Sequence, residues 1–391
     1  MASFKYFVVV LFLLSCMACN TTQAPLKTIV ITNTLPFERS NETVTIDLQG
    51  IASQNQMVFS IVKAGSETPL RSQVVDIDKD GLPDQLLFQP TIGGESTENY
   101  ELLKSTVDPS VIVDVTCFSR FVPERTDDYA WENDKVAFRT FGPEAQRMKE
   151  ANIKGGTLTS GIDAWLKCVD YPIIDKWYHK ETTDLGSYHE DTGEGLDNFH
   201  VGVSRGVGGS ALPIDGNYAV SKNFVTWTTH SVGPIRTSFT LTYESWSAGD
   251  KTIKESKTIS LDRGSHLSHI RHRIEGADTI AIGMTLHEND GQTTVNMDQG
   301  WTSYWQPHAD SELGMAVVIC DDAMVNSDKY LTDAKDESNL YALVEVKRNE
   351  VSYYSGFGWR KSGEFNSAAE WNSYIQQFAQ QLESPLTIEV L

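Results

Sequence analysis

One segment of the chain, residues 188–200, carries every side-chain type that a proton-transfer site requires. It holds a phenol, two imidazoles and several carboxylates, and a guanidinium follows at Arg205. Its glycine-rich, polar composition is typical of a loop that presents functional groups on a rigid scaffold. We therefore predict Tyr188, His189 and His200 as catalytic acid and base residues. Arg205 is predicted to bind the substrate.

The same segment has a plainer interpretation as a long surface loop rich in turn-forming residues, in which Asp197 and the other acids are simply solvated. A glycoside hydrolase would require two carboxylates at a fixed separation. Glu190, Glu194 and Glu288 are available for that role, but a sequence does not measure their separation.

A second candidate group lies on a strand expected over residues 266–274, the most positive short stretch of the chain. Alternation along a strand sends His269 and Arg271 to one face, while His272, between two isoleucines, faces the other as a satisfied histidine. Because Arg binds carboxylate or sulfate bidentately, we predict that His269 and Arg271 bind an anionic substrate. Cross-strand pairing with Glu255 is the alternative.

A third group follows the end of an apolar strand, where His287 precedes several aromatic residues that include Trp305. Polar groups at a strand end beside aromatic rings fit the rim of a sugar-binding cleft, so both residues are predicted to bind substrate. The alternative is a strand terminus that merely becomes polar. The chain has no zinc-protease motif, nucleophile elbow, phosphate loop or dinucleotide fingerprint.

A fourth segment resembles a calcium-binding loop, with Asp76, Asp78 and Asp80 at alternate positions before Gly81. A leucine replaces the glutamate expected at the twelfth position, and Asp84, at the ninth, could substitute for it in part. The alternative is a solvated hairpin turn, because Asp and Gly are favoured in turns. We therefore expect no required cofactor, and a structural calcium ion if this loop binds a metal.

The first residues predict an exported protein. A positive charge precedes a short apolar run, which is too short to span a bilayer but is typical of a secretory signal. The Leu-Leu-Ser-Cys stretch that ends at Cys16 resembles a bacterial lipobox, and Cys19 is a poorer candidate for lipidation. We expect a signal peptide with a lipobox over residues 1–18, a lipid anchor to the membrane, and a periplasmic or outer-membrane-attached location. An ordinary signal peptide is the alternative.

Composition restricts the ligands. A formal net charge of -21 argues against nucleic acid, which requires a basic surface. Nine Trp and fourteen Tyr could stack on sugar faces, although a large β-core also consumes aromatic residues. Cys117, Cys168 and Cys320 fit no zinc spacing, and either one disulfide with a free thiol or three buried thiols is compatible with the sequence.

The elements that must position these residues are mostly strands, because apolar and polar residues alternate along much of the chain. Short turns between the runs at 237–246, 252–261 and 266–274 predict antiparallel neighbours, with 279–287 as a fourth strand. Ser367 and Glu370 form a capping box that opens a helix over 367–383. Further strands are expected at 28–33, 43–48, 57–63 and 85–89, and a helix at 143–153.

These elements predict an all-β fold, a large antiparallel β-sandwich with a few helices. We expect one catalytic domain over residues 27–391, within which an N-terminal β-subdomain over 27–130 is an alternative division.

Four motifs together carry a resemblance to a known family: the lipobox, Asp-x-Asp-x-Asp-Gly-x-x-Asp at 76–84, Tyr-His-x-Asp-x-Gly-Glu-Gly-x-Asp at 188–197, and Val-Gly at 201–202 followed by Gly-Gly at 208–209. They resemble exported proteins of unknown function in the polysaccharide-utilisation machinery of bacteria that digest plant and algal cell walls. The resemblance implies a galactose-mutarotase-like supersandwich. It also implies an oligosaccharide dehydratase that acts on uronic acid at the non-reducing end of ulvan fragments.

Such a dehydratase removes the hydrogen on carbon 5, alpha to the carboxylate, while the hydroxyl on carbon 4 leaves as water. The enzyme must neutralise the carboxylate, place a base near the hydrogen and supply an acid to the hydroxyl. The candidates are His189 or His200 as base, Tyr188 as acid, and Arg205 or Arg271 at the carboxylate. A polysaccharide lyase, which expels a sugar instead of water, and a non-catalytic glycan-binding lipoprotein are the alternatives.

Overall fold

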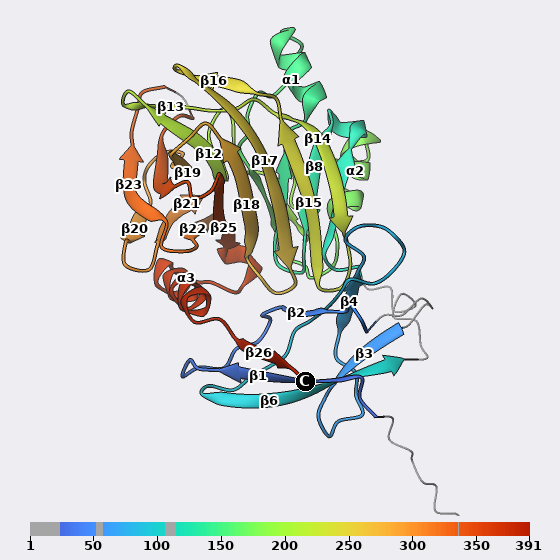
Figure 1. The fold of residues 1–391 in the computed structure, drawn as a ribbon. Helices are drawn as coiled ribbons and strands as arrows, with labels where there is room; N and C mark the ends of the chain where they lie inside the picture. The colour runs from blue at the N-terminus through green and yellow to red at the C-terminus, as the bar shows by residue number, and fades with distance from the viewer. Residues whose placement is uncertain (1–23, 52–57, 106–114, 335) are drawn as a thin grey trace, which may run out of the picture.

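Alternating apolar residues build a nine-stranded antiparallel sheet that forms one layer of a β-sandwich (Figure 1). The computed structural model describes residues 24–51, 58–105, 115–334 and 336–391. The sheet has the order β14-β15-β17-β18-β25-β22-β21-β20, and β16 pairs with β17. Its strands are β14 (Phe224–Ser231), β15 (Arg236–Tyr243), β16 (Trp246–Ala248), β17 (Lys251–Asp262), β18 (Leu267–Glu275), β20 (Gln292–Asn296), β21 (Trp301–His308), β22 (Ser311–Ile319) and β25 (Glu350–Trp359).

Two five-stranded sheets form the opposite layer. One has the order β11-β10-β9-β8-β7 and the other β13-β12-β19-β24-β23. Their strands are β7 (Phe118–Val122), β8 (Asp128–Glu132), β9 (Ala137–Thr140), β10 (Asp163–Lys167), β11 (Gly195–Leu196), β12 (Val207–Ile214), β13 (Asn217–Ala219), β19 (Thr279–Thr285), β23 (Met324–Tyr330) and β24 (Asn339–Glu345). One large hydrophobic cluster, with members from all three sheets, fills the space between the layers.

The expected run of antiparallel neighbours is confirmed for β15, β17 and β18, but not for the fourth strand. β19 pairs with β12 and β24 in the opposite layer, and β18 pairs instead with β25. The chain therefore crosses from one layer to the other between Glu275 and Thr279.

The helices cover the outside of the sandwich. α3 (Ala368–Glu383) begins as expected, since Ser367 Oγ accepts a hydrogen bond from Glu370 N at 3.3 Å. It packs against β21 and β22 and lies between the nine-stranded sheet and the small sheets below it (Figure 1). α1 (Pro143–Glu150) was expected, whereas α2 (Ile174–Thr182) was not. Two 3-10 turns are η2 (Pro123–Arg125) and η3 (Arg360–Ser362).

A small unit, made of β1–β6 and β26, has its own hydrophobic core. Two sheets, β26-β1-β6-β3 and β2-β5-β4, enclose it. The last strand, β26, returns from α3 to pair with β1. The strands are β1 (Lys27–Asn33), β2 (Val44–Asp47), β3 (Val58–Lys63), β4 (Ser72–Val75), β5 (Gln85–Phe88), β6 (Ser96–Ser105) and β26 (Thr387–Val390).

The expected fold class, an all-β antiparallel sandwich with a few helices, is confirmed. The expected signal peptide, Cys16 and Cys19 lie outside the described residues. Within the described ranges, no helix is both long and apolar enough to cross a bilayer. Cys117, Cys168 and Cys320 are free thiols, and since Cys168 is exposed, neither expected cysteine arrangement is present.

Candidate active site

Three charged side chains lie on the outer face of the sheet β7–β11, beneath α2. Asp128, Arg139 and Asp163 come from β8, β9 and β10, and the strand register places Arg139 directly opposite Asp163. Side chains two positions apart on a strand lie on the same face. The three charged residues therefore share this face with a second apolar cluster, which includes Trp165 and residues of α2. Sequence reasoning missed this group. A signal was present, because each of the three strands is otherwise buried and yet carries a charged side chain.

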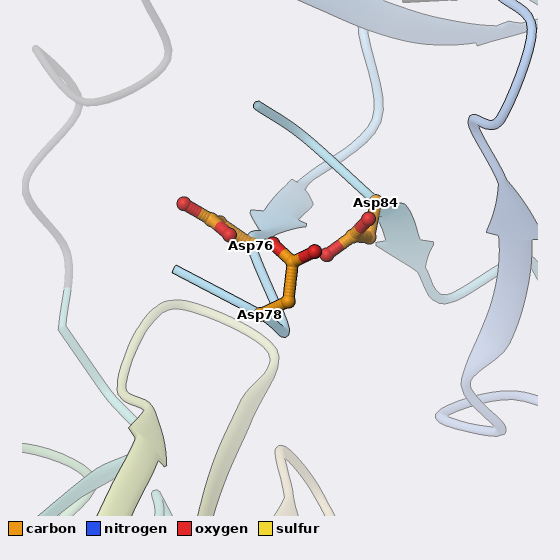
Figure 2. Close-up of side chains that lie close together, drawn as sticks. All are labelled: Asp76, Asp78 and Asp84. Carbon is orange, nitrogen blue, oxygen red and sulfur yellow. The ribbon is translucent and has the colours of Figure 1, made fainter. Parts of the chain in front are cut away.

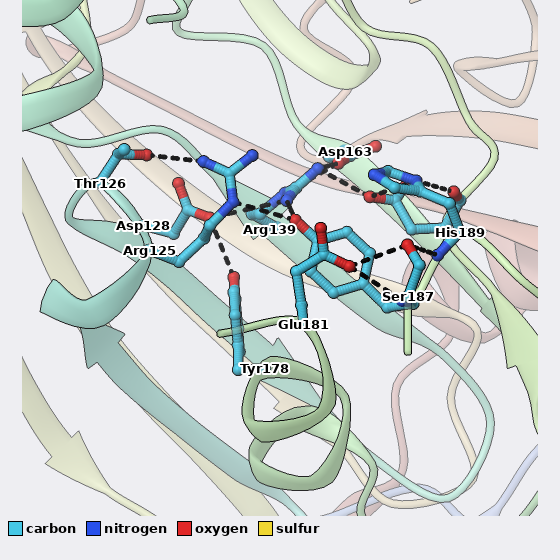
Figure 3. A network of polar contacts seen from close by, with 11 residues as sticks. Arg125, Thr126, Asp128, Arg139, Asp163, Tyr178, Glu181, Ser187 and His189 are labelled. Carbon is cyan, nitrogen blue, oxygen red and sulfur yellow. Dashed lines mark hydrogen bonds and ion pairs between the residues drawn. The ribbon is translucent and has the colours of Figure 1, made fainter. Parts of the chain in front are cut away.

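Arg139 is the centre of this polar network (Figure 3). Its Nε and Nη2 donate to Asp163 Oδ2 at 2.9 and 2.5 Å, and Nη2 also donates to Asp197 Oδ2 at 2.8 Å. Its Nη1 donates to the phenol oxygen of Tyr188 at 3.1 Å. Asp197 is therefore a buried ion-pair partner, and the alternative in which it is solvated in a surface loop was wrong.

Tyr188 connects this network to a second arginine. Its side chain is 1% exposed, and its oxygen also accepts a hydrogen bond from Arg125 Nε at 3.1 Å. Arg125 lies at the end of η2, is only half-buried, and donates from Nη1 to Thr126 Oγ1 at 3.1 Å. No carboxylate of the described residues lies within 4.0 Å of its guanidinium. Arg125 is therefore a half-buried cation without a salt bridge among the described residues, although the charges of Asp128 and Asp197 act on it at longer range. Sequence reasoning missed it.

His189 lies beside Tyr188 with its ring centroid 4.6 Å away, in an edge-to-face arrangement. Its side chain is 54% exposed. Nδ1 lies 2.5 Å from the carbonyl oxygen of Asp197, and because a carbonyl only accepts, Nδ1 must carry the hydrogen. In the neutral ring the lone pair is then on Nε2, which has no protein partner among the described residues. His189 thus presents this ring nitrogen to solvent, and its role as a base stays a prediction.

The backbone that holds His189 depends on a glycine. Gly195 begins β11 with φ +105°, and a Cβ there would lie 1.9 Å from the carbonyl oxygen of Leu166 on β10. Only glycine permits this approach. The close pairing of β11 with β10 returns the chain to the sheet and places Asp197 beneath His189. We refer below to Arg125, Tyr188 and His189 as the acid–base site.

Carboxyl groups under the acid–base site have strongly raised pKa values. Burial, with repulsion from Asp197, raises the pKa of Asp163 to about 7. Burial likewise raises the pKa values of Asp128 and Asp197 to about 6, against the attraction of Arg139. Perturbed carboxyls beside an open cation are frequent in active sites, although structural ion-pair networks also produce them.

These pKa values predict a pH-dependent stability. Between the unfolded value of about 4 and the folded values of about 6 to 7, the folded chain binds protons that the unfolded chain does not. The free energy of unfolding must therefore fall as pH rises through this window. Asparagine has the shape of a protonated aspartate but does not titrate. The variant Asp163→Asn should therefore lose the part of the pH dependence of stability that Asp163 contributes. Denaturant unfolding at pH 5 and pH 8 should show the wild-type stability falling relative to the variant by on the order of 1 kcal/mol.

Asp250, which is exposed in the turn between β16 and β17, gives the matched control. Asp250→Asn should leave the pH dependence of wild type unchanged. A constant stability difference between wild type and Asp163→Asn across this pH range would contradict the assignment.

His200 and His287 lie at the far end of the same loop. His200 Nε2 is 2.9 Å from Asp336 Oδ2, and His287 Nε2 is 3.0 Å from the carbonyl oxygen of His200. Gly202 permits the contact with Asp336, because a Cβ there would lie 2.1 Å from that carboxylate. The structure thus brings His200 and His287 together, and their predicted place at the rim of a sugar-binding cleft stays a prediction.

Further contacts connect these histidines to the segment that follows Asp197. Asn198, which follows Asp197 in the chain, is bonded to His308 Nε2 at 3.0 Å, and the His287 and His308 rings are 6.0 Å apart. Burial lowers the pKa of His308 to about 4, so this ring is neutral at physiological pH.

Two predicted substrate-binding residues do not fit that role. Arg205 is 1% exposed, and neutral groups surround its guanidinium, which donates to Ser160 Oγ, Thr159 Oγ1 and two carbonyl oxygens. Trp305 is buried beneath α3, and its Nε1 donates to Glu312 at 3.3 Å. Both side chains are buried and already bonded to other groups of the protein, so neither is available to a sugar at the surface.

His269 and Arg271 lie on a different surface. Ser268 Oγ accepts a hydrogen bond from Trp131 Nε1 of β8 at 2.9 Å, so Ser268 faces the opposite layer and its neighbour His269 faces away from it. Arg271 shares that outer face and is exposed. The expected alternation is confirmed, since His272 is buried and bonded to Glu255 at 2.6 Å. These two residues nevertheless do not join the acid–base site.

The calcium-like loop brings part of its expected ligand set together (Figure 2). Carboxylate oxygens of Asp76, Asp78 and Asp84 lie within 4.8 Å of one another, whereas Asp80 is not part of the group. Several of these oxygens already accept backbone N–H bonds, such as Asp76 Oδ2 from Gly81 N at 2.8 Å. The donor set is one that calcium accepts, and the hairpin-turn alternative explains the same hydrogen bonds. Calcium binding remains a prediction.

Calcium should stabilise the chain if this loop binds it. After treatment with a chelator, calcium at about one hundred times its Kd adds about 2.7 kcal/mol, which raises Tm by several degrees. Asp76→Ala should abolish this increase, whereas Asp250→Ala should retain it. Thermal unfolding with and without calcium measures the effect, and identical Tm values for wild type would show that the loop is only a turn.

Comparison with known proteins identifies the family. The family model described as "Domain of unknown function (DUF4861)" matches residues 31–388. A protein of Formosa agariphila, called uncharacterized protein P7, is 50% identical over 379 residues, which cover 95% of each chain.

Two solved structures from Enterococcus faecalis resemble the fold more distantly. One is called an alpha-mannosidase (TM-score 0.46, 8% identity, covering 93% of this chain and 46% of that one). The other is called a protein of glycosyl hydrolase family 38 (TM-score 0.49, 8% identity, covering 93% and 47%). This chain spans about half the length of each, and such similarity carries no argument about chemistry. The family match and the Formosa relative show that the chain belongs to the DUF4861 family.

Proposed function

We propose that this chain is an oligosaccharide dehydratase that eliminates water across carbons 4 and 5 of a non-reducing-end uronic acid, in oligosaccharides of the ulvan type. The observation that carries the proposal is that one tyrosine contacts both a cation without a salt bridge and an exposed imidazole. Arg125 forms no salt bridge within 4.0 Å among the described residues, although Asp128 and Asp197 act on it at longer range, and Tyr188 contacts both Arg125 and His189. An elimination next to a carboxylate requires a cation for the carboxylate and a base for the neighbouring hydrogen.

In the proposed reaction, Arg125 binds the uronate carboxylate and stabilises the negative charge that develops on it. His189 Nε2 removes the hydrogen from carbon 5, and the electron pair of that bond forms the double bond between carbons 4 and 5. The bond from carbon 4 to its hydroxyl breaks, and the hydroxyl leaves as water after it takes the proton from the imidazolium. The products are one water and one 4,5-unsaturated uronic acid.

Tyr188 has a different role here from the acid that its residue type predicted. Its phenol is buried and accepts hydrogen bonds from both Arg125 and Arg139. In the proposal it orients Arg125 and therefore acts on the substrate only through that side chain. His200 and His287, on the rim, are proposed to contact the neighbouring sugar.

We also propose that the reaction takes place outside the cytoplasm, on a lipoprotein anchored through Cys16 and located in the periplasm or at the outer membrane. The lipobox supports this part of the proposal. Mass spectrometry of the N-terminal peptide, released from membranes of cells that express the full chain, would test it.

The test of function is an incubation of the purified protein with short uronic-acid oligosaccharides. It should follow ultraviolet absorbance of the unsaturated product and determine product masses. Rising absorbance with the loss of one water from an intact chain would support the dehydratase. Rising absorbance with shorter products would indicate a lyase, and an unchanged oligosaccharide that binds saturably would indicate a glycan-binding protein.

A further inference from the structure

A cavity of about 400 Å³ lies where the small unit, the outer face of the nine-stranded sheet and α3 meet. Its lining comes from residues 38–43 of the small unit, from strands of the sheet and from the last turns of α3. The volume is within the range of about 300 to 1,000 Å³ that small-molecule sites have. The acid–base site contributes none of its lining residues.

Aromatic rings form one wall of this cavity. His269 and Tyr354 stack with their ring centroids 4.4 Å apart and an angle of 12° between planes. Phe378 of α3 contacts Tyr354 edge-on at 4.9 Å. Burial and the nearby charge of Arg236 lower the pKa of His269 to about 4, so the stacked pair is uncharged at physiological pH. Each of the two stacked rings covers one face of the other, and the ring surface that remains toward the cavity is neutral and apolar, as packing against the apolar face of a sugar ring requires.

Neutral polar groups without partners complete the lining. Among the described residues, neither the Tyr354 hydroxyl nor the side-chain amides of Gln377 and Gln381 has a hydrogen-bond partner, although all three side chains line the cavity. Each of these groups can both donate and accept a hydrogen bond. Sugar hydroxyls also donate and accept, so the set matches a ring that carries several of them.

The charges of the cavity argue against an anionic ligand. Arg236 is bound bidentately to Asp262, with Nε–Oδ1 and Nη2–Oδ2 distances of 2.5 and 2.7 Å. Glu42 is bound to Arg39 at 2.8 Å, and Glu38 has no cation within 4.0 Å among the described residues. The lining therefore offers no free positive charge, in contrast to Arg125 in the acid–base site.

We propose that this cavity is a second carbohydrate-binding site, which takes a neutral saccharide unit and is separate from the acid–base site. It would hold a glycan to the protein without acting on it. Since the inference depends only on the cavity, it stands or falls independently of the proposed dehydratase activity.

Binding of neutral saccharides to the purified protein tests this site. Isothermal titration calorimetry with xylotriose, cellotriose and L-rhamnose should give saturable binding for at least one, and trigalacturonate should not compete for it. Tyr354→Phe and Gln377→Ala should each weaken binding by about 3- to 10-fold, the value of one hydrogen bond. Tyr354→Phe should leave Tm unchanged, because the lost hydroxyl has no partner within the described part of the chain.

Gln376 supplies a matched control, since it is an exposed glutamine one position earlier on α3 and does not line the cavity. Gln376→Ala should bind as wild type does. Three results would overturn the proposal: no binding of any neutral probe at millimolar concentration, equal affinity in the Tyr354→Phe and Gln377→Ala variants, or displacement of the neutral probe by trigalacturonate.

Discussion

His189→Ala is expected to lower kcat for uronic acid dehydration by about 10²- to 10⁴-fold, the usual contribution of a general base. The side chain is exposed, and its one hydrogen bond among the described residues is to the carbonyl oxygen of Asp197, so the fold should persist. The measurement is the initial rate of unsaturated-uronate formation at saturating substrate, together with the circular dichroism spectrum of the variant.

His179 offers a matched control, because it is an exposed histidine on the nearby α2. His179→Ala should retain wild-type kcat. If His189→Ala retained it as well, the base would have to be sought on the rim, where His200 is the next candidate.

Arg125→Met is expected to lower kcat/KM by about 10²- to 10³-fold, the loss that follows removal of one stabilising group from a developing charge. Arg125→Lys should recover only part of this loss. A lysine keeps the charge but loses the planar fork that binds a carboxylate, and it cannot reproduce the bond from Nε to Tyr188. Steady-state kinetics of the three proteins on one uronic-acid trisaccharide would measure both effects.

Arg147 provides the control for Arg125, since it is exposed on α1 and paired with Glu144. Arg147→Ala should leave kcat/KM unchanged. If Arg125→Met were as active as wild type, the carboxylate would have to bind elsewhere, and the proposed geometry would be wrong even if His189 were essential.

Much of the fold could be predicted because its signals are local. Alternation along β15, β17 and β18 and the capping box of α3 are properties of adjacent residues, and the structure has them as expected. The partners of β19 could not be predicted in this way. The sequence of a strand shows which of its faces is buried, but it does not show to which sheet the strand belongs. α2 was missed although Ile174, Trp177 and Tyr178 have helical spacing.

The candidate site was predictable only in part for a related reason. Tyr188 and His189 are neighbours in the sequence, so their side-chain types indicated chemistry directly. Arg125 and Arg139 come from separate elements and contact Tyr188 only after β7–β11 have paired. The prediction for Arg205 failed in the opposite direction, since it named a residue that does not belong to the site. Its residue type suggested contact with a ligand, but its guanidinium is bonded to uncharged groups of the protein itself.

The pairing of β26 with β1 has a consequence for the order in which the chain folds. Ile29 lies opposite Val390, so the sheet of the small unit is complete only after the whole sandwich and α3 have been synthesised. Until then one edge of β1 has no neighbour, and an open strand edge is a template for pairing with other chains. Contacts of such long sequence separation also form late. Nascent chains should therefore be most prone to aggregate through residues 27–33, and a chaperone that covers this edge until synthesis ends would raise the yield of folded protein.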